Sequence, residues 1–326
     1  MPYTASVENL DRLETYYVRA SDSLVWPSVF VLPGWLKAWW QVFGGGFKPL
    51  VLVFREGDAI IGIAPLKLKD GTASFIGDNS VCDYLDFVVS ANREGDFADA
   101  LLDSLPAYGI KRLNLETLRA ESVAFTRVAE VTRQHNLVVS CSQIDASFEM
   151  ELPSIWNNYL ESLETKQRHD IERKMRRLRR IGETRFRILS NTDVTDADLA
   201  LFFRMMADSR RDKARFLTAE MCVFFERIAR AMAAYGLLRL GFLEVGKARA
   251  ASILYFDYHS RIYLYNSGYD PDFAGSDAGL VSKLYCIQEA VAENKKVFDF
   301  LKGSEVYKSR LGGREVGLSR CVIDLG

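Results

Sequence analysis

Short alternating apolar and polar segments in the first half of the chain predict a sheet followed by helices and strands. Apolar runs at 49–54 and 59–68 flank Gly57, in a connection of the length that joins hairpin strands. We expect the other elements to be strands at 73–76, 84–89, 112–116 and 137–142, and helices at 35–42, 97–105 and 122–134. Antiparallel strands therefore come first, and helices alternate with strands afterwards.

The second half repeats this order of elements. Its predicted elements are helices at 196–208 and 219–234, a hairpin at 237–256, a strand at 261–268, a helix at 279–293 and a strand at 296–301. The two halves resemble each other in pattern and not in residues. The repeat predicts an α/β (α+β) protein with two similar domains, each a mixed, mainly antiparallel sheet flanked by helices.

A strongly basic segment separates the two halves. Between Lys166 and Arg187, ten basic residues stand against three acidic ones. Within it Ile171, Met175 and Leu178 recur at helical spacing, and we expect this helix to continue from residues 155–163. So narrow an apolar stripe predicts a helix that lies across a surface or bridges two domains. We place the domains at 1–152 and 153–326, and the second includes this linker helix at 165–182.

Length and composition fit this division. The chain has 326 residues, 48% of them hydrophobic, enough for two globular domains. Five cysteines are an odd number without a CxxC pair, so neither a disulfide framework nor a metal site is expected. We find no export signal and no membrane span, and we expect a cytoplasmic protein.

Several motifs in the second half occur in one order. They are the stretch 263–272, the helix start Ala278-Gly279-Leu280, the stretch 298–303 and the pair Tyr307-Lys308. This order resembles the CelD-like, cellulose-biosynthesis branch of the GNAT acyltransferases, which is similar to the FemA/FemX-type peptidyl transferases. The basic helix, the turn at 245–247 and Asp83 to Asp86 also match, so the resemblance covers roughly residues 50–315. Ala278 and Leu311 stand where the family usually has Pro and an aromatic residue, and neither change removes a reactive group.

The resemblance implies two tandem GNAT-like domains and an N-acyltransferase. The expected co-substrate is acetyl-CoA or another acyl-CoA, without a metal. The implied acceptor is the amine of a small molecule or glycan precursor, such as an amino sugar used in polysaccharide biosynthesis.

A helix N-terminus with free N–H groups is a common phosphate site, and the helix at 279–293 has such an end. The expected contacts with the coenzyme are Asn266, Ser267, Ser276, Ala278, Gly279 and Leu280. In the GNAT pattern, a backbone N–H near Asn266 and Ser267 binds the thioester oxygen. The alternative is that the stretch 275–279 only caps the helix, and the charge of Asp277 would oppose a pyrophosphate.

Three residues are predicted to be catalytic by the resemblance. Tyr307 would protonate the leaving thiolate, and Lys308 would stabilise developing negative charge. Asp299 lies on an apolar strand and, by alternation, faces opposite to its phenylalanine neighbours, where a cleft could be. The alternatives are that Tyr307 packs, that Lys308 is a solvated surface residue, and that Asp299 holds a turn or pairs with an arginine.

Acceptor contacts are predicted from the first domain and from the basic helix. Asp83, Tyr84 and Asp86 would bind the amine, or else the two carboxylates serve a turn or cap. Arg168 would contact a phosphate, unless the basic run is simply a solvated face.

Two further classes of function remain open. In the first, a Fem-like transferase takes an amino acid from aminoacyl-tRNA, and the basic segment meets the RNA backbone. In the second, the chain is a binding module without catalysis that uses the basic helix. The three histidines form no Ser-His-Asp or Cys-His arrangement with any specificity.

Overall fold

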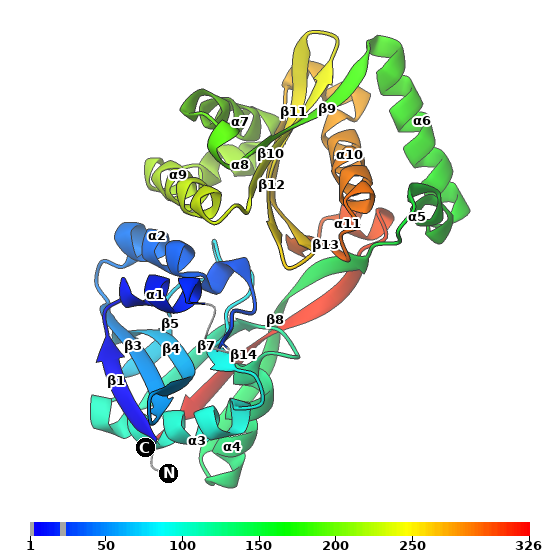
Figure 1. Ribbon diagram of the computed structural model, residues 1–326. Helices are drawn as coiled ribbons and strands as arrows, with labels where there is room; N and C mark the ends of the chain where they lie inside the picture. The colour runs from blue at the N-terminus through cyan, green and yellow to red at the C-terminus, as the bar shows by residue number, and fades with distance from the viewer. Residues whose placement is uncertain (1–2, 20–23) are drawn as a thin grey trace. The chain divides into compact units, whose positions relative to one another are not determined.

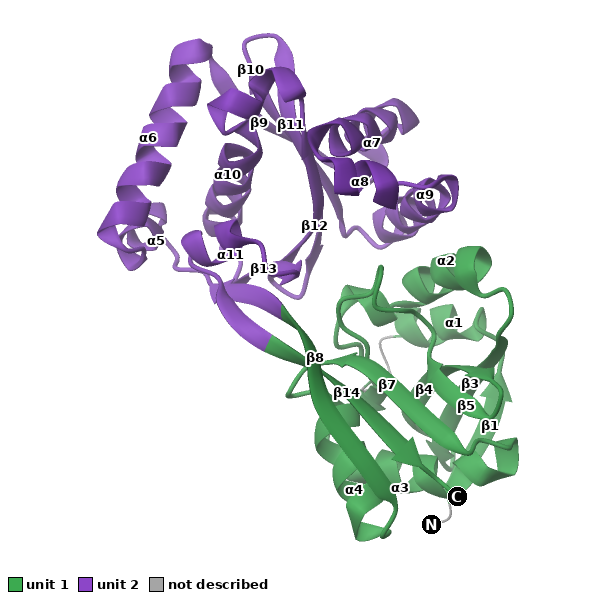
Figure 2. Ribbon diagram, turned by 180° about the vertical axis from the view of Figure 1, so that it is seen from behind, with its two compact units in different colours: residues 1–146, 317–326 green, residues 147–316 purple. Residues whose placement is uncertain are grey.

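The computed structural model describes residues 3–19 and 24–326, which form two compact units (Figure 2). Unit 1 comprises Met1–Ala146 and Gly317–Gly326, and unit 2 comprises Ser147–Val316. The chain leaves unit 1 along strand β8 (Val138–Glu151) and returns along strand β14 (Arg314–Asp324). The predicted ranges 1–152 and 153–326 differ in giving this last strand to the second half. The division into domains at 1–152 and 153–326 stays a prediction.

Unit 1 is built on a sheet with the strand order β1-β3-β4-β5-β7-β14-β8. The predicted hairpin is present, and its strands β3 and β4 pair with Leu52 opposite Ala64. Besides β8 and β14, the helices and strands of this unit are β1 (Thr4–Glu8), α1 (Arg12–Val18), β2 (Leu24–Val25), α2 (Pro33–Phe43), β3 (Lys48–Glu56), β4 (Ala59–Lys69), β5 (Thr72–Phe75), β6 (Val88–Ser90), α3 (Glu94–Ser104), β7 (Arg112–Leu118) and α4 (Ala129–Gln134).

The predicted strand at 84–89 is wrong for most of its length, because only β6 forms there. The cause is Asp86, whose buried carboxylate accepts hydrogen bonds from the N–H groups of Val123 at 2.8 Å and Ala124 at 3.0 Å. These bonds satisfy the start of the following helical segment and hold this part of the chain out of the sheet.

Unit 2 contains a second sheet path, with the order β8-β13-β12-β11-β10-β9. Helices α7, α8 and α9 cover one face of it, and α5, α6 and α10 lie on the other face (Figure 1). The elements are α5 (Trp156–Ser162), α6 (Thr165–Ile181), β9 (Thr184–Ser190), α7 (Asp196–Ser209), α8 (Arg211–Phe216), α9 (Ala219–Ala234), β10 (Leu238–Val245), β11 (Ala248–Tyr258), β12 (Arg261–Tyr269), α10 (Ala278–Ala292), β13 (Val297–Lys302) and α11 (Val306–Arg310). The expected class, a mixed and mainly antiparallel α/β architecture flanked by helices, is confirmed.

The basic segment forms helix α6, which belongs wholly to unit 2. Its stripe of Ile171, Met175 and Leu178 is buried in the same apolar cluster as α10, so the helix lies across the surface of this unit. The expected continuous helix from residue 155 is wrong. Leu163 and Glu164 have extended backbones that separate α5 from α6, and the Leu163 side chain is buried.

The strands β12 and β13 separate soon after they meet. Only three parallel pairs join them, from Arg261 with Val297 to Tyr263 with Asp299. Beyond this point β12 stays paired with β11 as far as Tyr269, whereas β13 follows β8. The parting opens the sheet between the second half of β12 and the segment after β13.

Helix α7 packs closely on the second half of β12. It starts with a capping box, in which Thr195 and Asp198 each accept a hydrogen bond from the backbone N–H of the other at 3.2 Å. Where the helix crosses the strand, Gly268 has no room for a side chain, because a Cβ atom there would lie 2.3 Å from the backbone nitrogen of Met206. The absence of a side chain at Gly268 therefore sets the position of α7.

We expect Gly268→Ala to destabilise unit 2 by about 2–3 kcal/mol, because the added methyl meets helix backbone that must shift as a body. The measurement is the free energy of unfolding in urea. The matched control is Gly275→Ala, since a Cβ atom at Gly275 meets no atom within 4 Å. Equal stabilities of the two variants would show that α7 does not sit against β12 as described.

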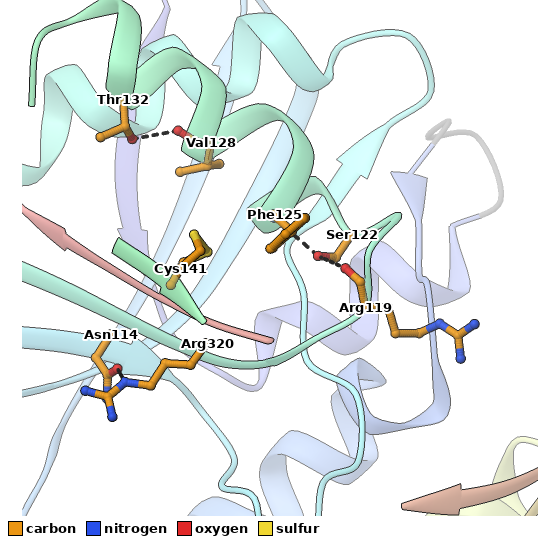
Figure 3. The surroundings of a disulfide bond; sticks show 9 residues. Asn114, Arg119, Ser122, Phe125, Val128, Thr132, Cys141 and Arg320 are labelled. Atoms are coloured by element: carbon orange, nitrogen blue, oxygen red, sulfur yellow. Dashed lines mark hydrogen bonds between the residues drawn. A yellow bond between two sulfur atoms is a disulfide. The ribbon is translucent and has the colours of Figure 1, made fainter. Parts of the chain in front are cut away.

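Unit 1 contains a disulfide between Cys141 of β8 and Cys321 of β14. Figure 3 shows it beside the helical segment that carries Val128 and Thr132, with Arg320 reaching Asn114 at 2.9 Å. The expectation from the sequence, that the cysteines form no disulfide, is corrected. The partners are 180 residues apart, and they meet only because the last strand returns to unit 1 after the whole of unit 2.

Reduction of this disulfide should lower the free energy of unfolding of unit 1 by about 2–4 kcal/mol, because the bond closes a long loop in the unfolded chain. Urea unfolding with and without dithiothreitol measures the effect. The double variant with Cys141→Ala and Cys321→Ala should be insensitive to the reductant. Two free thiols at these positions in non-reducing mass spectrometry would contradict the bond.

Across the described residues, no helix is long and apolar enough to cross a membrane.

Candidate active site

A cavity of about 270 Å³ lies where β12 and β13 part, and we call it the splay cavity. Its walls come from both faces of the sheet of unit 2: the end of α7 and α8 on one face, α10 on the other, and the segment after β13. The lining residues are Ser209, Arg210, Lys213, Ser267, Tyr269, Ala274, Asp277, Gly279, Leu280, Lys283, Glu305 and Tyr307. Most of these residues are polar or charged.

Two lysines of this cavity converge on Ser267 from opposite sides. The Lys213 ammonium donates to the backbone carbonyl of Ser267 and, at 3.1 Å, to Asn266 Oδ1. The Lys283 ammonium donates to Ser267 Oγ at 3.1 Å and to the Gly279 carbonyl at 2.8 Å. Lys283 also lies 4.9 Å from the centre of the Tyr307 ring.

Burial shifts the titration of these groups. Burial, together with a smaller effect of nearby positive charges, lowers the pKa of Lys283 to about 7 and that of Lys213 to about 8. It raises the pKa of the Tyr307 phenol, which stays protonated at neutral pH. Burial also opposes ionisation of Glu305, but the charge and hydrogen bond of Lys308 hold the pKa of that carboxyl below its usual value.

Lys308, predicted to be catalytic, is almost fully buried behind this cavity. Its ammonium donates to the carbonyls of Leu301 at 3.0 Å, Lys302 at 2.6 Å and Gly303 at 3.1 Å, and lies 3.0 Å from Glu305 Oε2. Leu301 and Gly303 both have positive φ angles. Lys308 therefore stabilises the turn at residues 301–303, because its ammonium satisfies carbonyls that would otherwise be buried without a donor. The catalytic role of Lys308 stays a prediction.

A larger cavity, of about 770 Å³, lies between α6 and the starts of α10 and α11, and we call it the α6 cavity. Its lining residues are Glu164, Lys166, Gln167, His169, Asp170, Ile171, Arg173, Lys174, Leu280, Tyr307, Arg310 and Leu311. Leu280 and Tyr307 line both cavities, so these two side chains form the wall between them.

The start of α10 is held by basic residues of α6. Asp277, in the left-handed conformation just before the helix, lies 3.4 Å from the Lys174 ammonium and 3.7 Å from the Arg177 guanidinium. The charge of Asp277 is therefore compensated by α6. Among the other predicted contacts, Ser276 is buried and donates to the Phe273 carbonyl at 2.6 Å, and Ala278 is buried as well.

The predicted oxyanion donor already has a partner. The backbone N–H of Ser267 donates to Asn266 Oδ1 at 2.9 Å. Before this N–H could bind a thioester oxygen, the Asn266 side chain would have to turn away.

Asp299 lies at the parting of the strands and is fully buried. Its carboxylate lies 3.1 Å from the Arg261 guanidinium and accepts the Leu301 N–H at 2.9 Å. Pairing with an arginine and holding a turn were the structural alternatives for this residue, and both contacts exist. Among the described residues it lines neither cavity, and its catalytic role stays a prediction.

The predicted acceptor residues lie in unit 1, apart from Arg168. Tyr84 is buried, with its ring edge against Phe30. Burial raises the pKa of Asp86 to about 7, while its bonds to backbone N–H groups act in the opposite direction. Asp83 is half-buried, and Arg168 is half-buried on α6 but is not among the residues lining the α6 cavity. Contact of these four with an acceptor stays a prediction.

Sequence reasoning missed Lys213, Lys283 and Glu305. A signal for Lys283 was present, because α10 is apolar on nearly every side and a lysine at its centre must be buried. Lys213 gave no such signal, since it stands in the charged stretch 210–215.

Residues 165–309 match the acetyltransferase (GNAT) domain family. The match runs from α6 into α11, so it contains the parted strands, the whole lining of the splay cavity and most of the lining of the α6 cavity. The matched residues all lie in unit 2, and membership of the CelD-like branch stays a prediction. No curated protein matches the chain.

Solved structures share the fold over nearly the whole chain. FemX has a TM-score of 0.64 at 11% identity, and the alignment covers 97% of this chain and 96% of that one. L-PGS from Bacillus licheniformis has a TM-score of 0.55 at 9% identity, covering 89% and 90%. A tandem GNAT protein from the clavulanic acid biosynthesis pathway has a TM-score of 0.50 at 11% identity, covering 100% and 99%. The expected fold class is confirmed by these similarities.

Replacement of Lys308 by Met should lower the free energy of unfolding by about 2–4 kcal/mol, because three carbonyls and Glu305 lose their partner. Urea unfolding measures it, and the exposed Lys247→Met in the β10–β11 turn is the control. A loss below 1 kcal/mol would contradict the structural role. A hundredfold loss of turnover with unchanged donor binding would, separately, support the catalytic role.

Proposed function

We propose that unit 2 transfers an acyl group, with acetyl favoured, from an acyl-CoA thioester to an amine. The observation that carries this proposal is the pair of adjacent cavities, lined mostly by the region that matches the GNAT acetyltransferase family, one on each side of Tyr307 and Leu280. Two substrates that exchange a group need adjacent sites, so that the reacting atoms can meet. An amino sugar or other polysaccharide precursor stays a prediction for the acceptor.

We assign the donor to the α6 cavity. Its volume suits a large ligand, and Lys166 and Arg310 supply exposed positive charge for the phosphates of a coenzyme. Two acidic residues, Glu164 and Asp170, line this cavity. Asp170 is already paired with Arg173 at 2.6 Å and Lys174 at 3.2 Å. The cavity can thus accept a polyanion without leaving this carboxylate unpaired.

Tyr307 is placed to serve the leaving group. When the neutral amine attacks the thioester carbonyl, a C–N bond forms and the C–S bond breaks, negative charge develops on sulfur, and the proton released by the nitrogen passes to solvent. A phenol whose pKa is raised by burial stays protonated and donates a hydrogen bond to that sulfur. Because such a phenol is a weaker acid than an ordinary thiol, we assign it stabilisation of the thiolate rather than complete proton transfer.

A second candidate is a Fem-like transferase that uses aminoacyl-tRNA. The observation in its favour is the exposed basic face of α6, formed by Arg173, Arg176, Arg177, Arg179 and Arg180. Such a face would bind an RNA backbone with affinity that falls steeply as salt rises. The same face also suits an acidic protein partner without catalysis.

Charge reversal separates these functions. The double variant Lys166→Glu with Arg310→Glu, both exposed at the α6 cavity, should bind acetyl-CoA at least tenfold more weakly in calorimetry, or about 1.4 kcal/mol. The matched control, Arg176→Glu with Arg180→Glu, changes exposed residues of α6 that do not line the cavity, and should bind like the wild type.

Failure of the wild type to bind acetyl-CoA at millimolar concentration would reject the acyl-CoA proposal. If the control pair instead abolishes binding of tRNA, and that binding falls steeply with salt, the second candidate replaces the first.

A further inference from the structure

The chemistry of the splay cavity centres on Lys213 and Lys283. Lys213 reaches Ser267 from α8 and Lys283 reaches it from α10, on opposite faces of the sheet (Figure 1). Lys283 is 7% exposed, a rare degree of burial for a lysine.

Each of these ammonium groups has hydrogen-bonding capacity left for a ligand. An ammonium carries three N–H donors. Lys213 uses two of them on Asn266 and Ser267, and Lys283 uses two on Ser267 and Gly279. Since both residues line the splay cavity, the remaining donor of each is available to a group bound there.

Neither lysine has a carboxylate of its own. Among the described residues, no acidic group lies within ion-pair distance of Lys213 or Lys283. The two acidic residues of the cavity are engaged elsewhere: Glu305 with Lys308 at 3.0 Å, and Asp277 with Lys174 at 3.4 Å. Arg210 is likewise paired, with Asp212 at 2.8 Å. The cavity therefore contains two cations that the protein does not neutralise.

We propose that Lys213 and Lys283 form a binding site for an oxyanion, a carboxylate or a phosphate, carried by the acyl acceptor. The acceptor would be an acidic amine, such as an amino acid or a phosphorylated amine. The assignment of the anion to an acyl acceptor rests on the proposed function. The existence of the anion site itself does not depend on acyl transfer.

Location and size assign the anion to the acceptor. The donor phosphates have a separate basic cavity beside α6, on the α10 side of the sheet. The splay cavity includes Ser209, Arg210 and Lys213 from the α7–α8 side, where no residue of the α6 cavity lies. Its volume of about 270 Å³ admits a small acidic group and not a whole coenzyme.

Binding should depend on pH because both lysines must be charged. The groups that face them are Arg210 and Asp212 at the start of α8, Asp277 before α10, Cys286 of α10, and Glu305, Tyr307 and Lys308 after β13. With pKa values of about 7 for Lys283 and about 8 for Lys213, the free protein loses positive charge as pH rises. A bound anion raises both pKa values, so affinity falls as protons are lost.

Sulfate is the probe, because it stays a dianion throughout this range. Calorimetry of the full chain should show sulfate binding at about pH 6.5 that is at least tenfold weaker at about pH 9. Lys213→Met and Lys283→Met should each weaken binding at least tenfold, with Lys247→Met as the control. Lys213 is only half-buried, so its variant keeps the test decisive if the buried Lys283→Met fails to fold.

Acetyl-CoA titrations in saturating sulfate decide which substrate carries the anion. Unchanged affinity for acetyl-CoA supports an acceptor site. Displacement of acetyl-CoA by sulfate would assign the anion to the donor and overturn the proposal, as would equal sulfate binding by wild type and both lysine variants. Parallel titrations with acetate and with inorganic phosphate identify the preferred oxyanion. Sulfate binding without acetyl-CoA binding would reject the proposed function and leave the anion site intact.

Discussion

The parting of β12 from β13 after three residue pairs is the constraint on which the rest of unit 2 depends. Strands that separate inside a domain expose backbone carbonyls, and buried carbonyls need donors. Lysine supplies those donors here. Lys308 holds the carbonyls of residues 301–303 and Lys213 holds that of Ser267, while Lys283 donates to Ser267 Oγ. The placement of these three lysines thus follows from the opening in the sheet.

This solution has an electrostatic consequence. Desolvation lowers the pKa values of Lys213 and Lys283. Of the three lysines, only Lys308 has a carboxylate beside it, that of Glu305. The splay cavity is therefore a polar site with uncompensated positive charge, whereas the α6 cavity gains its charge from exposed side chains on a surface helix. Tyr307 separates two environments that attract anions by different means.

Several residues of types that are often catalytic stabilise the fold instead. Asp86 accepts the N–H groups that open a helical segment, and Asp299 pairs with Arg261 while fixing the turn into Leu301. Sequence reasoning held both uses open for Asp299 and for the aspartates of unit 1, because a carboxylate beside an aromatic residue looks the same in either role. The choice depends on which donors approach it, and those donors lie 37 residues away for Val123 and 38 for Arg261.

The sequence by itself determined the order of helices and strands, the β3–β4 and β10–β11 hairpins and the apolar stripe of α6, because periodicity and turn residues act over a few neighbours. The motifs between Tyr263 and Lys308 also pointed to the GNAT family that residues 165–309 match. Only the tertiary structure decided that Lys213 and Lys283 meet at Ser267, that Cys141 meets Cys321, and that Lys308 is enclosed by carbonyls. These contacts arise where distant segments are brought together by sheet pairing, and no local spacing encodes which charges will then share a cavity.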